Sequence, residues 1–131
     1  MSRENVELVR EGYAAWERGD IDGIVEGVTP DVEIVQPPEV PDSKTYRGKA
    51  GVVEAFADWP KQWDEFRAEL LEVIDISDTK VVSVTRHYLR ARDIDIEQEV
   101  AYVHTFRGDL IVRWEMFFTR DEALEAAGLS E

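Results

Sequence analysis

Residues 80–118 read KVVSVTRHYLRARDIDIEQEVAYVHTFRGDLIVRWEMFF, and they decide the fold. β-Branched and aromatic side chains dominate this stretch and are interrupted by two short polar gaps, which is typical of strands joined by tight turns. Short connections of this kind join antiparallel neighbours. The stretch therefore predicts two antiparallel hairpins, with strands at 80–90, 96–107 and 110–118.

A further strand is expected just before this stretch, at 66–76, and upstream of it the pattern becomes helical. Val6, Val9, Tyr13 and Trp16 recur every three or four residues, which places them along one side of a helix. The other expected elements in this half are the rest of that helix (2–18), a short helix at 21–28, a strand at 32–36, and a helix after Gly48 that Pro60 should kink or end.

The predicted fold class is α+β. Residues 119–122 have the pattern of a capping box and open a short C-terminal helix. We expect a cone-shaped, strongly curved antiparallel sheet with three helices on its concave side and this short C-terminal helix. A chain of 131 residues and 15.0 kDa suits one hydrophobic core, so residues 1–131 are expected to form a single domain.

Composition narrows the possible partners. The 29 acidic and 15 basic residues give a net charge of −14, which disfavours nucleic acid and anionic membrane surfaces as partners. The absence of cysteine excludes disulfides and thiolate metal sites. No stretch is apolar enough to span a membrane and the N-terminus does not resemble a signal peptide, so a cytoplasmic location is expected.

Four segments carry a family resemblance: EGYAAWERGDIDGI (11–24), PDVE (30–33), YRGKAGV (46–52) and DEALEAAGL (121–129). In this order and spacing, the chain resembles the SnoaL-like branch of the nuclear-transport-factor-2-like superfamily, which has the ketosteroid isomerase-like fold. The resemblance implies a homodimer that holds a small, largely apolar molecule in the cone. It also implies a cofactor-independent isomerase, hydrolase or cyclase, with a non-catalytic ligand-binding or dimeric interaction module as the alternative.

The best-known catalytic positions of this superfamily are not filled. A ketosteroid isomerase uses a carboxylate base, together with a tyrosine and a protonated aspartic acid that stabilise the enolate. By resemblance these positions fall on Gly12 (tyrosine), Gln36 (base) and Val103 (acid), which lack the required groups. The carboxylate of an epoxide hydrolase or cyclase would fall on Met116, and the neighbouring Glu115 is expected on the opposite sheet face.

Three other residues are predicted to be catalytic: Glu99, Arg86 and His87. Arg86 and His87 lie in the middle of a strand, and the hairpin register decides which of them faces the cone. Histidine titrates near neutrality and arginine stabilises negative charge. Glu99 is expected on the cone side, where burial would raise its pKa. The alternative is that Arg86 and Glu99 make surface ion pairs and His87 is a satisfied structural residue.

Aromatic side chains suggest the walls of a ligand site, because flat rings suit a flat or cyclic apolar molecule. Gln36 is expected to hydrogen-bond the ligand at the mouth of the cone, although a core role is the alternative for each apolar side chain. The predicted ligand-binding residues are Trp16, Gln36, Phe56, Trp59, Trp63, Val103, Trp114, Met116 and Phe118.

The convex sheet face is the expected dimer interface, because exposed aromatic side chains on a sheet need to be covered. The alternation of the strands places Tyr102, His104, Phe106 and Phe117 there. Two histidines without patterned carboxylate partners make a metal site unexpected. No nucleotide or phosphate motif is present, so no cofactor is expected either.

Overall fold

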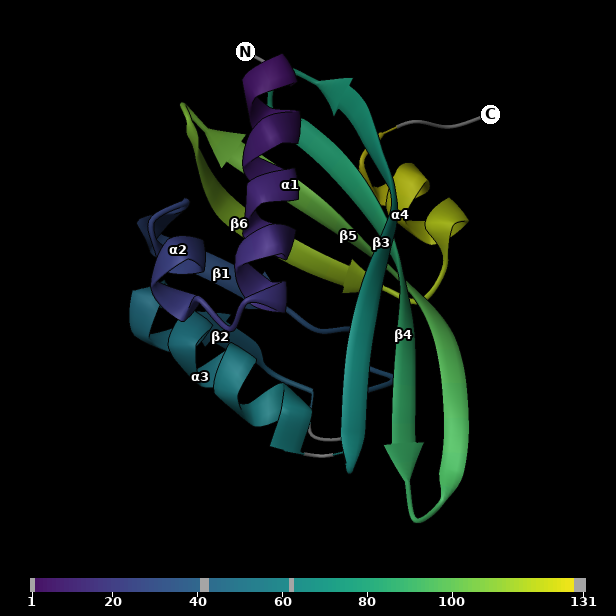
Figure 1. Ribbon diagram of the computed structural model, residues 1–131. Helices are drawn as coiled ribbons and strands as arrows, with labels where there is room; N and C mark the ends of the chain where they lie inside the picture. The colour runs from purple at the N-terminus through teal and green to yellow at the C-terminus, as the bar shows by residue number, and fades with distance from the viewer. Residues whose placement is uncertain (1, 41–42, 62, 129–131) are drawn as a thin grey trace.

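The computed structural model describes residues 2–40, 43–61 and 63–128, and it shows helices packed on a strongly twisted sheet (Figure 1). Leu129, the last residue of the C-terminal motif, lies outside the described residues. The elements are α1 (Ser2–Glu17), α2 (Ile21–Val25), β1 (Val28–Val35), β2 (Thr45–Arg47), α3 (Gly48–Lys61), β3 (Glu65–Ser77), β4 (Lys80–Ala91), β5 (Ile94–Arg107), β6 (Leu110–Phe117) and α4 (Arg120–Ala126).

The sheet has six strands in the order β2-β1-β6-β5-β4-β3. The three hairpins formed by β3 to β6 are antiparallel, as the sequence predicts. β1 and β6 run parallel, so the sheet is mixed and not wholly antiparallel. Parallel neighbours need a long connection, and here it contains β2, α3 and the three hairpins. The predicted α+β architecture is confirmed.

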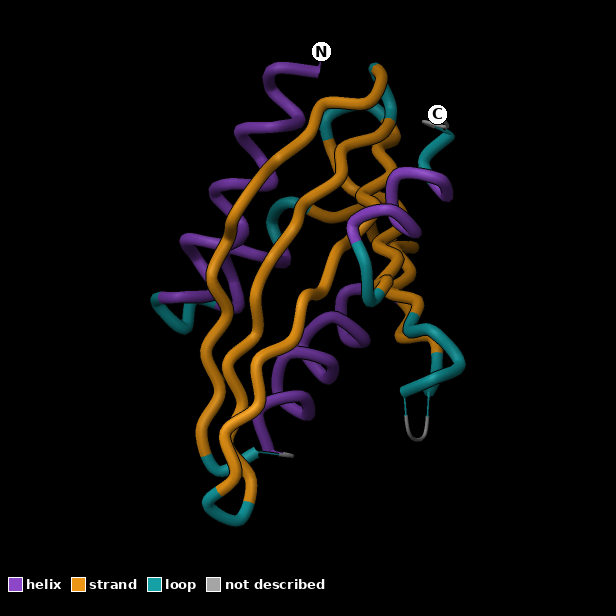
Figure 2. The backbone as a smooth tube through the Cα atoms, turned by 90° about the vertical axis from the view of Figure 1, so that its right-hand side faces the viewer, coloured by secondary structure: helices purple, strands orange, loops and turns teal. Residues whose placement is uncertain are grey.

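Helices cover both faces of the sheet, but unequally (Figure 2). The first three helices pack on the concave face, where α1 lies over β3 and β4, and α3 lies over β1 and β2. α4 packs on the opposite face, against Val82 and Val84 of β4 and Ala101 and Val103 of β5. Thr119 caps α4 by accepting a hydrogen bond from the Glu122 N–H at 3.1 Å.

As a result, β4 and β5 are buried on both faces where α4 covers them. Val81 and Val82 of β4 lie on opposite faces, yet both are 0 % exposed. On the concave face these strands place Ser83 and His87 (β4) beside Tyr102 and His104 (β5). Polar side chains therefore enter the interior at this point, on a strand pair that would otherwise be apolar.

Two glycines inside helices offer a matched test of the packing. A Cβ on Gly51 of α3 would lie 3.1 Å from the backbone carbonyl carbon of Tyr46, whereas a Cβ on Gly12 of α1 would meet nothing within 4 Å. We expect Gly12→Ala to raise the free energy of unfolding by about 0.5–1 kcal/mol, because alanine favours helices. Gly51→Ala should lower it by about 1 kcal/mol or more, because backbone must shift. Urea unfolding measures both, and equal stabilisation would contradict the close approach of α3 to β2.

Candidate functional site in the cone

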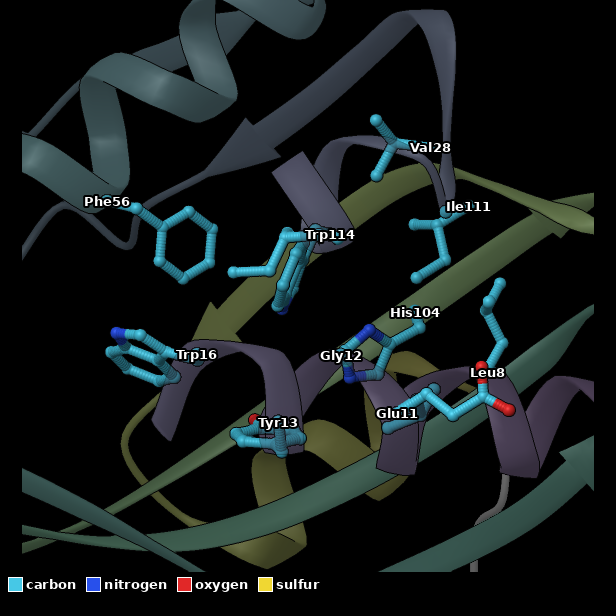
Figure 3. Close-up of a pocket in the computed structure, with 14 residues that line it drawn as sticks. Leu8, Glu11, Gly12, Tyr13, Trp16, Val28, Phe56, His104, Ile111 and Trp114 are labelled. Atoms are coloured by element: carbon cyan, nitrogen blue, oxygen red, sulfur yellow. The ribbon is translucent and has the colours of Figure 1, made fainter. Parts of the chain in front are cut away.

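The concave face and the first three helices enclose two small chambers. The first, of about 50 Å³, lies between α1, α2 and β6, with His104 in its wall (Figure 3). The second, of about 60 Å³, lies toward α3 and the end of β1. Trp16, Phe56 and Trp114 line both chambers. We call these three side chains the aromatic partition.

The partition crosses the cone from α1 to the sheet. Phe56 of α3 stands edge-on to Trp16 of α1, with ring centroids 5.2 Å apart and planes at 80°. Its other side meets Trp114 of β6 at 5.6 Å. Edge-to-face packing of this kind is favourable and specific in geometry. The two chambers are therefore separated by side chains alone and not by backbone.

A buried chain of hydrogen bonds ends at the first chamber. The Tyr13 hydroxyl lies 3.0 Å from the Ser83 hydroxyl, which lies 2.9 Å from Nε2 of His104. The Nδ1 atom of His104 is buried and has no hydrogen-bond partner among the described residues. Figure 3 shows His104, Trp114 and Phe56 converging on the same space. The chain therefore fixes the imidazole through Nε2, and Nδ1 is the ring nitrogen that stays without a partner among the described residues.

The two hydrogen bonds of this chain can run in either direction, because each hydroxyl and the neutral imidazole can donate or accept. If Tyr13 donates to Ser83 and Ser83 donates to Nε2 of His104, both hydroxyl protons are used. The reverse direction leaves the Tyr13 proton without a partner among the described residues. The first arrangement puts the imidazole proton on Nδ1. In that arrangement His104, which lines the first chamber, carries its N–H at the unpartnered Nδ1.

His87 is more deeply enclosed. It is 0 % exposed, and neither ring nitrogen has a partner among the described residues. Rings of Trp16, Trp59, Phe66 and Tyr102 surround it, with centroids 5.2–6.5 Å away. Burial lowers the pKa of His87 to about 4, and that of His104 to about 3. Both histidines are therefore neutral at pH 7.

Unpartnered polar atoms concentrate in this part of the protein. Seven buried side-chain nitrogen or oxygen atoms lack a partner among the described residues, and six of them are ring nitrogens in or beside the cone. Native proteins satisfy the large majority of such atoms, so each exception needs an explanation. The six are Nδ1 and Nε2 of His87, Nδ1 of His104, and Nε1 of Trp59, Trp63 and Trp114.

Six of the nine predicted ligand-binding residues line the second chamber, and three do not. Trp63 packs on Trp59 outside the lining of both chambers, and Phe118 packs with Val40 and Val100. Val103 does not face the cone at all. The remaining six line the second chamber: Trp16, Gln36, Phe56, Trp59, Trp114 and Met116.

The prediction of which β5 side chains face the cone and which face outward is wrong. Tyr102, His104 and Phe106 face the cone, so they are not on the convex face where the dimer interface was expected. Val103 and Glu99 lie on the outer side, and the Glu99 carboxylate accepts a hydrogen bond from the Arg120 N–H of α4 at 2.7 Å. Because α4 covers the outer face, both sides of β5 are apolar and alternation cannot identify the inner one. Phe117 is on the outer face as expected, and a homodimer stays a prediction.

The structure also shows which of the two β4 residues, Arg86 or His87, faces the cone. Arg86 points outward, with its guanidinium 3.7 Å from the Glu97 carboxylate, and His87 points into the cone. The predicted trio of Glu99, Arg86 and His87 is therefore not assembled in one site. Of the three, only His87 is on the cone side, and it lines neither chamber.

Sequence reasoning missed the hydrogen-bonded group of Tyr13, Ser83 and His104. A usable signal was present on β4, where Ser83, Thr85 and His87 alternate with valine and arginine and so share one face. Polar residues at every second position of an apolar strand indicate a polar lining. Among the described residues, no three histidine or acidic side chains are grouped to hold a metal ion, and no helix is long and apolar enough to cross a membrane.

The unpartnered nitrogens of His87 predict an unusual mutational effect. We expect His87→Leu to raise the free energy of unfolding at pH 7 by about 1–2 kcal/mol, because an unsatisfied buried polar group costs about 1–3 kcal/mol. Thr85→Val on the same strand face is the control. It should be destabilising, because the Thr85 hydroxyl donates to the Val100 carbonyl at 2.7 Å. Urea unfolding that showed similar losses for both variants would contradict the description of His87.

The low pKa values of the two histidines predict acid sensitivity. The unfolded chain binds protons at both imidazoles below about pH 6.5, whereas the folded chain does not until about pH 4 at His87 and about pH 3 at His104. As the pH is lowered through this range, the free energy of unfolding should therefore decrease by about 1.4 kcal/mol per pH unit for each histidine. His87→Leu should reduce this slope by about 1.4 kcal/mol per unit between about pH 6 and pH 4.5. An unchanged slope in urea unfolding across that range would show that His87 is not buried as a neutral ring.

Comparisons with known proteins agree with this fold. An uncharacterized protein of Mycobacterium tuberculosis is 28% identical over 123 residues, which cover 93% of this chain and 94% of the relative. Bal32a, from a soil-derived mobile gene cassette, has a similar structure, with a TM-score of 0.82, 21% identity and coverage of 95% and 96%. TerC, co-crystallized with polyporic acid, gives a TM-score of 0.79 and 26% identity, with coverage of 95% and 98%. A family model described as SnoaL-like domain matches residues 9–114, so the protein belongs to the SnoaL-like domain family.

Proposed function

We propose that the protein binds a small, largely apolar, ring-containing molecule in the cone and transfers a proton on it without a cofactor. The observation that carries the proposal is the buried, unpartnered Nδ1 of His104 in the wall of an aromatic chamber. An unsatisfied buried donor costs about 1–3 kcal/mol, and a ligand oxygen would remove that penalty. The aromatic side chains around it supply apolar contact with a ring.

The chemistry follows from the protonation of His104. Burial keeps the imidazole neutral, and its proton lies on Nδ1 when Tyr13 donates to Ser83 and Ser83 donates to Nε2. A neutral imidazole donor in a dry site can polarise a carbonyl and stabilise an enolate. Glu11 is the acidic residue in the lining of the same chamber, and its carboxylate would accept a proton from the carbon beside that carbonyl. Isomerisation and ring closure both proceed through such an enolate.

A non-catalytic binding protein is the second candidate. Glu11 is exposed, and no hydrogen bond to a described residue fixes its carboxylate. A general base needs a defined position relative to the proton that it removes. In this alternative, His104 and the aromatic walls hold the ligand and no proton is transferred.

The bicyclic ketone 2-tetralone distinguishes the two candidates. In deuterated buffer, the wild-type protein should accelerate exchange of the protons beside the carbonyl, followed by NMR, and 2-tetralone should quench tryptophan fluorescence. His104→Leu should reduce the exchange rate by about a hundredfold, because it removes the donor to the enolate oxygen. Glu11→Gln should reduce exchange while leaving binding intact. His87→Leu is the matched control and should retain exchange, because His87 lines neither chamber.

Each other outcome has a definite meaning. Binding of 2-tetralone without accelerated exchange would favour the binding protein. Exchange that survives His104→Leu would show that His104 is not the donor. Absence of binding to the wild-type protein would count against both candidates.

A further inference from the structure

We infer that the ligand is elongated and spans both chambers, with about two linked rings and a polar group at each end. This inference rests on the proposed function, because it assumes that a ligand binds in the cone at His104. It adds the length of the ligand and the position of a second polar contact.

Neither chamber holds a ring by itself. Their volumes are about 50 and 60 Å³, and an apolar protein cavity that binds benzene has a volume of roughly 150 Å³. A ring that is wholly enclosed therefore has to displace part of a wall. The wall that the chambers share is the aromatic partition, so a ring that enters through it joins the two chambers into one cavity.

Phe56 is the member of the partition best placed to move. Trp16 also packs against Tyr13, Phe66 and His87, and Trp114 also packs against Tyr102 and His104. By contrast, the ring of Phe56 packs against the other two members of the partition. It lies between them and has no polar atom to hold it. Rotation of this one side chain would open a continuous apolar path.

Each chamber has polar side chains of its own in its wall. His104 lines the first chamber and not the second, whereas Gln36 and Tyr102 line the second and not the first. The Gln36 amide oxygen accepts from the Lys44 N–H at 3.4 Å, which leaves its NH₂ group for a ligand. No described residue hydrogen-bonds the Tyr102 hydroxyl. An apolar two-ring molecule with an oxygen at each end matches this arrangement.

Three probes of graded length test the inference: phenol, 4-phenylphenol and 4,4′-dihydroxybiphenyl. The last two have the same rings and differ by one hydroxyl. In the wild-type protein, calorimetric titration should show 4,4′-dihydroxybiphenyl binding about tenfold more tightly than 4-phenylphenol, because it makes one more buried hydrogen bond. Tyr102→Phe with Gln36→Leu should abolish this ratio, and so should His104→Leu. A ratio near one in the wild-type protein would overturn the inference.

The partition is tested by a matched pair of deletions. Phe56→Ala removes the ring between the chambers and should increase the affinity for both two-ring probes about tenfold, because no side chain then has to be displaced. Phe66→Ala removes the same atoms beside Trp16 but outside both chamber linings, and it should give no such gain. Equal or weaker binding to Phe56→Ala would overturn the role of the partition. Thermal unfolding and near-UV circular dichroism confirm that each variant is folded.

The probes also separate the inference from the proposed function. If phenol binds in a way that His104→Leu weakens, but the two-ring probes show no ratio, the proposed function stands and the two-chamber inference fails. If none of the three probes binds, or if His104→Leu changes none of the affinities, the proposed site at His104 fails as well.

Discussion

The cone depends on one constraint, which is that the part of β4 and β5 beneath α4 is covered on both faces. α4 and the ends of β3 cover the outer face, so Val82, Val84, Ala101 and Val103 form a small apolar core there. The helices of the N-terminal half cover the inner face. A strand pair shielded from water on both sides can hold neutral polar side chains in a fixed position, since its backbone ladder is protected from competing solvent. Ser83, His87, Tyr102 and His104 occupy that position.

The same constraint explains what could be predicted from the sequence. Helical and strand periodicity located the main elements, and the short polar gaps located the hairpins, because these signals are local. β2 was missed because a three-residue strand has too few positions to show alternation. The choice of inner face on β5 failed for a different reason. Alternation reveals a face only when the other face is polar, and α4 makes both faces of β5 apolar near Val103 and His104.

The site was predictable to the extent that it is made of large aromatic side chains. Trp16, Phe56 and Trp114 are noticeable because a small core rarely needs so many rings. The hydrogen-bonded group was not predictable, because Tyr13, Ser83 and His104 come from α1, β4 and β5 and only the register of the hairpin brings them together. For Glu99 and Arg86, the sequence could not show that both point outward, since a shift of one residue reverses the face.

The hydrogen bonds that dock α1 also set the chemistry of His104. Tyr13 belongs to the apolar face of α1, and its hydroxyl reaches the sheet at Ser83, so the helix position and the Ser83 proton are linked. When Ser83 donates to Nε2 of His104, the imidazole proton lies on Nδ1. A displacement of α1 would therefore break the hydrogen bond between Tyr13 and Ser83. The loss of that bond would also free Ser83 to change its hydrogen bond with His104. An all-apolar contact would also dock the helix, but it would not hold the imidazole of His104 through a hydrogen bond at Nε2.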